Sequence, residues 1–267
     1  MDIQLLILCG LTFVIHLIGT LAYAVRIAGV RTRRIAVCFA LFNILVLVSR
    51  TSNSFQGPFL AKRIEEDIVQ GLSQGLLADF RWLLLSATIA TIVGAFLIPT
   101  FQRLFSLAVG HFQVHRSLPK LLMHGFFKGG LGYVIDAVRL PSSQNVTSMK
   151  NGRGISPWVF VFNTLAVALW TIGVFAALYA GALNPELRVT ASTLASVVNG
   201  VATILMFVFI DPHLSVMTDD VLEGRVAESR FRQAIVWLVG SRLAGTILGQ
   251  ALLVPSAMVI ASIAAVM

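Results

Sequence analysis

The feature of this sequence that most limits its fold is the recurrence of apolar runs about as long as a lipid bilayer is thick. The hydrocarbon core is roughly 30 Å deep, and a helix needs about 20 residues to cross it. Six segments approach or meet this length, at residues 3–25, 35–58, 81–98, 157–183, 190–210 and 231–255. Only 12% of the residues are charged, whereas soluble domains carry about 25%. We therefore predict a single all-α domain, residues 1–267, that is a polytopic integral membrane protein with about six transmembrane helices.

The longest region between predicted spans, residues 100–155, is strongly basic. It contains seven lysines and arginines and a single acidic residue, Asp136. Its apolar segments, such as Leu104–Phe112, are interrupted by basic residues and glycines, as is typical of helices that lie in the membrane interface over anionic lipid. We expect a basic interfacial region on the cytoplasmic side, with anionic membrane lipids as its partners.

The distribution of lysine and arginine predicts the orientation of the chain. These residues concentrate after the first, third and fifth spans, and cytoplasmic loops are the ones enriched in positive charge. Both termini are therefore expected outside the cytoplasm. The net charge of +8 bears on topology and lipid contact in a chain of this kind, and we expect no nucleic-acid partner.

Two predicted spans contain an arginine, Arg50 and Arg242, where a charge costs several kcal/mol unless it faces protein, water or an anion. A wet internal cavity would satisfy both, and phosphate matches the guanidinium geometry well. Polar residues recur at helical spacing in four of the six spans, as Thr12, His16, Thr20 and Tyr23 do on one face of the first. The candidate cavity residues are Arg50, Asn53, Gln56, Arg242, Gln250, Asn199 and His16. Two alternatives stay open: the polar residues hold helices together, and His16 is a packed residue bonded to Thr12 or Thr20.

The segment Asp211–Arg225 is an acidic cluster that has three interpretations. Asp211 and Pro212 would end one helix, with Asp219 or Asp220 beginning another. The acids would otherwise form a gate by pairing with arginines. In the third, Asp219, Asp220 and Glu223 would hold magnesium against a pyrophosphate. The candidate gating residues at the two ends of the chain's spans are Lys62, Glu65, Glu66, Asp67, Asp211, Asp219 and Asp220.

Small residues follow one another along the last span at Ser241, Gly245 and Gly249. Such a ridge lets two helices approach closely. It serves equally well for packing within one chain or for a homodimer, and the sequence leaves both open.

Two strings carry a resemblance to a known family: RTSNSFQGPFLAKRIEEDI, residues 50–68, and DPHLSVMTDDVLEG, residues 211–224. They are similar to those of the Amj family of bacterial lipid II flippases, the alternative to the MurJ flippase. The likeness extends over the whole chain in length, span layout and motif order.

The resemblance implies a transporter in the bacterial plasma membrane, without enzymatic activity and without a metal or other cofactor. Its substrate would be lipid II, the undecaprenyl-pyrophosphate-linked precursor moved to the outer leaflet for peptidoglycan synthesis. Two rival classes remain at this stage. One is a membrane enzyme acting on a polyprenyl pyrophosphate with magnesium, and the other is a structural membrane protein.

Overall fold

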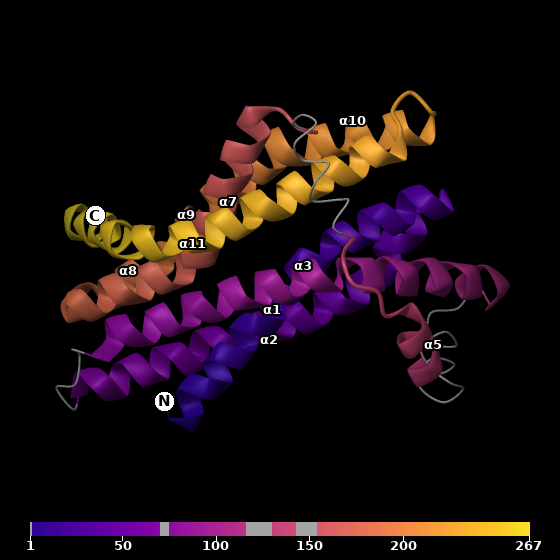
Figure 1. Ribbon diagram of the computed structural model, residues 1–267. Coiled ribbons are helices and arrows are strands. Elements are labelled where there is room, and N and C mark those ends of the chain that lie inside the picture. The colour runs from indigo at the N-terminus through magenta and orange to yellow at the C-terminus, as the bar shows by residue number, and fades with distance from the viewer. Residues whose placement is uncertain (1, 70–74, 116–129, 143–153) are drawn as a thin grey trace.

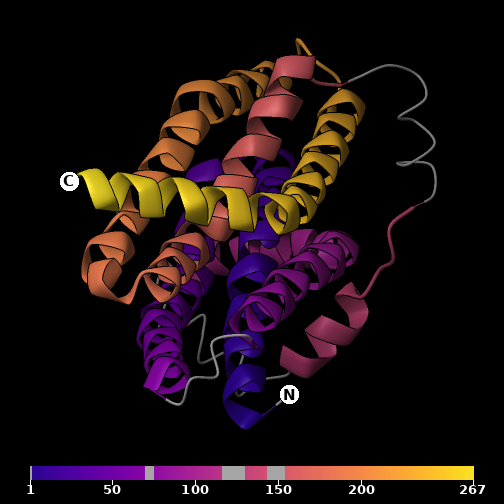
Figure 2. The ribbon, with the colours of Figure 1, turned by 90° about the vertical axis from the view of Figure 1, so that its left-hand side faces the viewer.

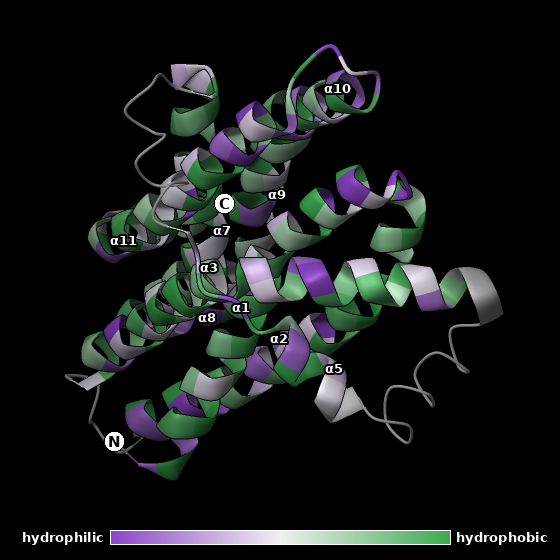
Figure 3. Ribbon diagram, turned by 45° about the vertical axis from the view of Figure 1, so that its right-hand side comes forward, coloured by the Kyte–Doolittle hydropathy of each residue, from purple (hydrophilic) through white to green (hydrophobic). Residues whose placement is uncertain are grey.

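In the computed structural model, residues 2–69, 75–115, 130–142 and 154–267 are described. They are almost entirely helical, and they include six helical segments that are long and apolar enough to cross a membrane. The prediction of an all-α polytopic membrane protein is confirmed. Figure 3 shows hydrophobic residues along the lengths of these helices and many of the hydrophilic ones towards their ends.

The helices form an N-terminal and a C-terminal group. The N-terminal group comprises α1 (Ile3–Thr32), α2 (Ile35–Val69) and α3 (Leu76–His115), and α5 (Gly130–Ala137) follows it. The C-terminal group comprises α7 (Pro157–Leu183), η3 (Pro185–Leu187), α8 (Arg188–Thr193), α9 (Ala195–Leu205), η4 (Met206–Ile210), α10 (Asp211–Leu222) and α11 (Glu228–Val266).

Figure 1 shows both termini towards one end of the molecule, with α5 and α10 towards the other. Two clusters of buried apolar side chains join the helix groups. One includes Leu8 of α1, Phe80 of α3 and Leu253 of α11. The other includes Tyr23 of α1 and Phe231 of α11. α1, α3 and α11 each contribute to both clusters, so these three helices hold the two groups together.

Two helices continue through prolines where the sequence predicted an end. α2 runs past Pro58 to Val69, and α3 runs past Pro99 to His115. Proline is tolerated in membrane helices when neighbouring helices and side chains satisfy the freed backbone groups. The last helix, α11, likewise contains Pro255, and Figure 2 shows it changing direction along its course.

The predicted interfacial segment Leu104–Phe112 is instead the end of α3. Phe105 and Val109 are buried against Cys38 and Phe42 of α2, and the rings of Phe42 and Phe105 meet edge to face at 6.2 Å. Burial against α2 continues the helix as part of the bundle. Residues 116–129 and 143–153 of the predicted basic region lie outside the described residues.

The prediction that Asp211 and Pro212 end one helix, with Asp219 or Asp220 beginning another, is wrong. The chain remains helical from Ala195 to Leu222, through the π-helical segment η4 directly before Asp211. Pro212 has no backbone N–H to donate, and a widened turn accommodates that loss. Asp219 and Asp220 therefore lie inside α10 and cap nothing.

The small-residue ridge of α11 packs within the chain against α7. Ser241, Gly245 and Gly249 are buried, and the buried amide of Asn163 on α7 donates to Ser241 Oγ at 2.6 Å. A side chain added at Gly245 would meet the Thr164 carbonyl oxygen at 2.7 Å. The ridge is thus used inside the subunit, and a homodimer stays a prediction that needs another surface.

One arginine ties the N-terminal group together at the end where the termini lie. Arg63 of α2 donates through Nε to Asp79 of α3 and through Nη1 to Asp2, both at 2.7 Å. Only 12% of its side chain is exposed. Asp2 also accepts the backbone N–H of Leu5. That bond and Arg63 hold the pKa of Asp2 below its ordinary value.

We expect Arg63→Gln to lower the free energy of unfolding by about 2 kcal/mol or more, because hydrogen bonds to charged groups contribute about 1.5–3 kcal/mol each. Lys62→Gln is the matched control, because Lys62 makes only an exposed pair with Glu66 at 3.6 Å, and its loss should cost about 0.5 kcal/mol or less. Thermal unfolding in detergent measures both. The stabilisation from Asp2 should be complete above its ordinary pKa and lost as the pH falls through the lowered value. Equal effects of the two substitutions would contradict this account.

Candidate functional site

A line of buried polar residues runs along one face of α1. Thr12, His16, Thr20 and Tyr23 are at most 8% exposed. Spacings of three and four residues place them on one helical face, as the sequence predicted. The two threonine hydroxyls each donate to a carbonyl one turn earlier in α1, at 2.8 Å. Their oxygens remain available as acceptors, and each receives a hydrogen bond from a different helix. We call these four residues and the partners described next the polar seam.

The two donors to the polar seam are Gln56 of α2 and Arg242 of α11. Gln56 Nε2 donates to Thr12 Oγ1, and Arg242 Nε donates to Thr20 Oγ1 at 3.1 Å. The Arg242 guanidinium lies directly against Gly19, where any side chain would collide with it. No carboxylate among the described residues forms an ion pair with Arg242. The seam therefore holds an uncompensated positive charge deep in the helix bundle.

His16 lies in the seam between these two contacts. It is 5% exposed, and its Nδ1 has no hydrogen-bond partner among the described residues. His16 is a packed residue, and the Thr20 hydroxyl donates to its backbone carbonyl at 2.8 Å rather than to its ring. The ring adds a second polar group to the seam that is free to bond a water or a ligand.

The structure gathers three of the seven predicted cavity residues, His16, Gln56 and Arg242, and places the other four elsewhere. Arg50 and Asn53 are exposed on α2, whereas Ser52 and Gln56, on an adjacent face of the same helix, are buried. No described residue bonds to the Arg50 side chain.

Gln250 and Asn199 are also separate from the seam. Gln250 Nε2 donates to the Arg81 carbonyl at the start of α3, at 3.1 Å. Asn199 of α9 lies against Gly173 of α7, and its buried Oδ1 has no hydrogen-bond partner among the described residues.

Five of the seven candidate gating residues form ion pairs: Lys62, Glu65, Glu66, Asp211 and Asp220. Arg26 of α1 pairs with Asp211 of α10 at 3.1 Å, and Arg188 at the start of α8 pairs with Glu65 of α2 at 3.7 Å. Both pairs link the N-terminal helix group to the C-terminal one. Asp220 pairs locally with Arg225 at 2.9 Å. Among described residues, no group of three His, Cys, Asp or Glu side chains converges as metal ligands would, which does not support the magnesium interpretation of Asp219, Asp220 and Glu223.

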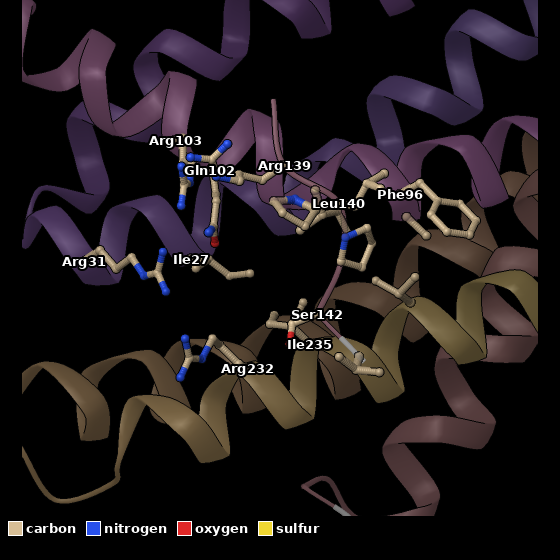
Figure 4. Close-up of a pocket in the computed structure, with 16 residues that line it drawn as sticks. Ile27, Arg31, Phe96, Gln102, Arg103, Arg139, Leu140, Ser142, Arg232 and Ile235 are labelled. Carbon is tan, nitrogen blue, oxygen red and sulfur yellow. The ribbon is translucent and has the colours of Figure 1, made fainter. Parts of the chain in front are cut away.

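Sequence reasoning missed a pocket at the end of the molecule opposite the termini. Its volume is about 410 Å³, and it lies between α1, α3, α11 and the segment after α5. Figure 4 shows Arg31, Arg103, Arg139 and Arg232 around it, together with Gln102. The sequence places Arg31, Arg103 and Arg139 between predicted spans and Arg232 at the start of the last one, and nothing in their spacing indicated that four separate segments would bring them together.

These observations define a class, the multi-pass membrane proteins, with two unusual features: an unpaired arginine among the membrane helices and an arginine-lined pocket near one end. Comparison with known proteins gives the family. The profile of the Amj family, described as "Alternate to MurJ", matches residues 11–264, and the chain belongs to this family.

A curated relative from Bacillus subtilis (strain 168), named Lipid II flippase Amj, is 40% identical over 266 residues. The alignment covers 97% of this chain and 96% of the relative. No solved structure matches the chain.

Proposed function

We propose that this protein is a lipid II flippase that moves the undecaprenyl-pyrophosphate-linked precursor from the inner to the outer leaflet of the bacterial plasma membrane. The observation that carries the proposal is its likeness, along nearly its whole length, to the Bacillus subtilis flippase. A transporter of this kind catalyses no covalent change, which agrees with a site built from arginines and neutral polar groups.

The polar seam has the chemistry that such a substrate needs. Lipid II joins a doubly charged pyrophosphate to sugars and a peptide on one side and to a long apolar chain on the other. Arg242 offers a guanidinium without a carboxylate partner, and His16 and Gln56 offer neutral polar groups beside it. The headgroup would cross along these residues while its chain stays in lipid.

Arg50 supplies a second charge along the route. Its position on the exposed face of α2 places it outside the seam, so it would meet the headgroup on the lipid-facing side of the helix. Asn53, one turn further on, would bond the sugars there. Asn199 and Gln250 stay candidates for headgroup contact on the C-terminal helix group.

The inter-group ion pairs would serve as latches in this cycle. Arg26–Asp211 closes one end and Arg188–Glu65 the other. The end that carries Arg26 and the arginine-lined pocket would face the cytoplasm, with both termini outside, because positive charge is retained on the cytoplasmic side.

Complementation tests the function. A bacterium depleted of its own lipid II flippases should regain growth, and lipid II should appear at its outer surface, when it expresses this chain. A strain carrying the empty vector sets the baseline. If the chain reaches the membrane in normal amounts and no lipid II becomes exposed, the proposed function is wrong.

A further inference from the structure

The arginine-lined pocket carries more positive charge than the carboxylates around it neutralise. Four guanidinium groups surround it. Among the carboxylates that the structure describes, Glu228 is the one that pairs with them: it accepts from Arg31 Nε at 2.8 Å and lies 3.7 Å from Arg232. Arg139 donates only to the neighbouring Val138 carbonyl, and Arg103 has no partner among the described residues. The Arg232 Nε is buried without a hydrogen-bond partner in the same described part of the chain. A buried donor left unsatisfied costs about 1–3 kcal/mol, so an acceptor that enters the pocket, such as an anion, would stabilise it.

The walls of the pocket are apolar on the side that leads along the membrane helices. Phe96 and Pro99 of α3 face Ile235 and Val239 of α11 across it. Phe96 is 56% exposed, so this side opens to the surface of the helix bundle. Figure 4 shows the arginines on one side of the space and Phe96 well away from them on the other. A ligand that fills both parts has a strong negative charge joined directly to an apolar chain.

The pocket has few neutral polar side chains that could hydrogen-bond to sugars or a peptide. Gln102 and Ser142 are its neutral polar side chains. A volume of about 410 Å³ lies at the lower end of the roughly 300–1,000 Å³ range of small-molecule sites. A disaccharide with a pentapeptide needs more room and many more hydrogen-bond partners, so that part of a lipid-linked precursor would stay outside.

We propose that this pocket is the entry site of the transporter and binds the pyrophosphate and the first isoprene units of a polyprenyl-linked lipid, recognising the carrier and ignoring the sugars and peptide. The proposal rests on the proposed function for the identity of the anionic lipid. Arg103 and Arg139 supply the charge, the buried Arg232 Nε supplies a fixed donor, and the walls formed by α3 and α11 hold the chain. Two phosphates in series span several guanidinium groups, which one phosphate cannot do equally well.

The test uses the full chain in phosphatidylcholine nanodiscs and farnesyl pyrophosphate as the probe, with calorimetry as the measurement. Arg103→Gln and Arg139→Gln should each weaken binding about tenfold, as expected for one charge-assisted hydrogen bond. Neither arginine pairs with a described carboxylate, so neither substitution leaves a carboxylate without its partner. Arg34→Gln, an equal charge change at an exposed position outside the pocket, should leave the affinity within about twofold.

Three further arms identify the ligand. Farnesyl monophosphate and inorganic pyrophosphate should each bind at least about tenfold more weakly than the probe, and undecaprenyl pyrophosphate should displace lipid II. Wild-type affinity in both pocket variants would overturn the proposal. So would equal binding of inorganic pyrophosphate, or loss of probe binding in nanodiscs that contain phosphatidylglycerol, which would show a site for anionic lipid in general. Failure of complementation with intact probe binding would reject the flippase function and leave the pocket assignment standing.

Discussion

Arg242→Gln should reduce lipid II transport by about tenfold or more while leaving the purified protein folded. Arg242 is the charged member of the polar seam, and one charge-assisted hydrogen bond to a phosphate contributes about 1.5–3 kcal/mol, which corresponds to about tenfold or more in rate. Stability should not fall with it, because the substitution removes an uncompensated charge and glutamine can still reach Thr20. The two readouts are lipid II exposure in the depleted strain and thermal unfolding in detergent.

The matched control is Arg230→Gln on the same helix, at an exposed position near the start of α11, where transport should persist. The two readouts also separate the rival explanation. If Arg242 only holds helices together through Thr20, its substitution will lower the melting temperature and transport together. Normal transport in a normally folded Arg242→Gln variant would show that the polar seam is not part of the transport path.

Gly245→Ala should lower the free energy of unfolding by about 1–3 kcal/mol, as overpacking does in tight interiors. The added methyl group would lie 2.7 Å from the Thr164 carbonyl oxygen and 2.8 Å from the Val167 Cβ, so α7 and α11 must separate. Gly245→Leu should prevent the two helices from packing at all. Loss of transport should follow the loss of folded protein in both variants.

Gly240→Ala provides the comparison on the same helix, because nothing lies within 4 Å of the position its Cβ would take. Alanine there should stabilise α11 by about 0.5–1 kcal/mol through its higher helix propensity. Thermal unfolding of both variants in the same detergent is the measurement. A neutral Gly245→Ala would show that the approach of α7 to α11 is not tight.

The number of spans and the existence of the polar seam follow from local sequence pattern, whereas the partners of the seam do not. Helical periodicity places Thr12, His16 and Thr20 on one face of α1, and burial confirms that face. Periodicity also groups Arg50 with Asn53 correctly, but it cannot say whether that face of α2 points into the bundle or out of it. Packing decided this, because Ser52 and Gln56 on the adjacent face are buried.

The arginine-lined pocket could not be predicted from the sequence at all. Arg31, Arg103, Arg139 and Arg232 come from four separate segments, and only tertiary structure brings them together. Asn163 is similar: its amide bonds to Ser241 of α11, a pairing that neither helix reveals alone. The helix ends were misjudged at Pro58 and Pro99 because proline ends helices far more reliably in water than between packed membrane helices.

The contacts of α1 also constrain how the protein is made. Thr20 of α1 bonds to Arg242, which lies 222 positions later in the sequence. Arg31 and Arg26 of the same helix pair with Glu228 and Asp211, 197 and 185 positions later. A ribosome releases α11 last, so α1 enters the bilayer well before these partners exist. During that interval the threonine hydroxyls donate to carbonyls of their own helix. The free-energy cost of exposing this polar face to lipid before assembly is therefore low. Assembly of the two helix groups is therefore a late event, and chains truncated before α11 should leave α1 without its final neighbours.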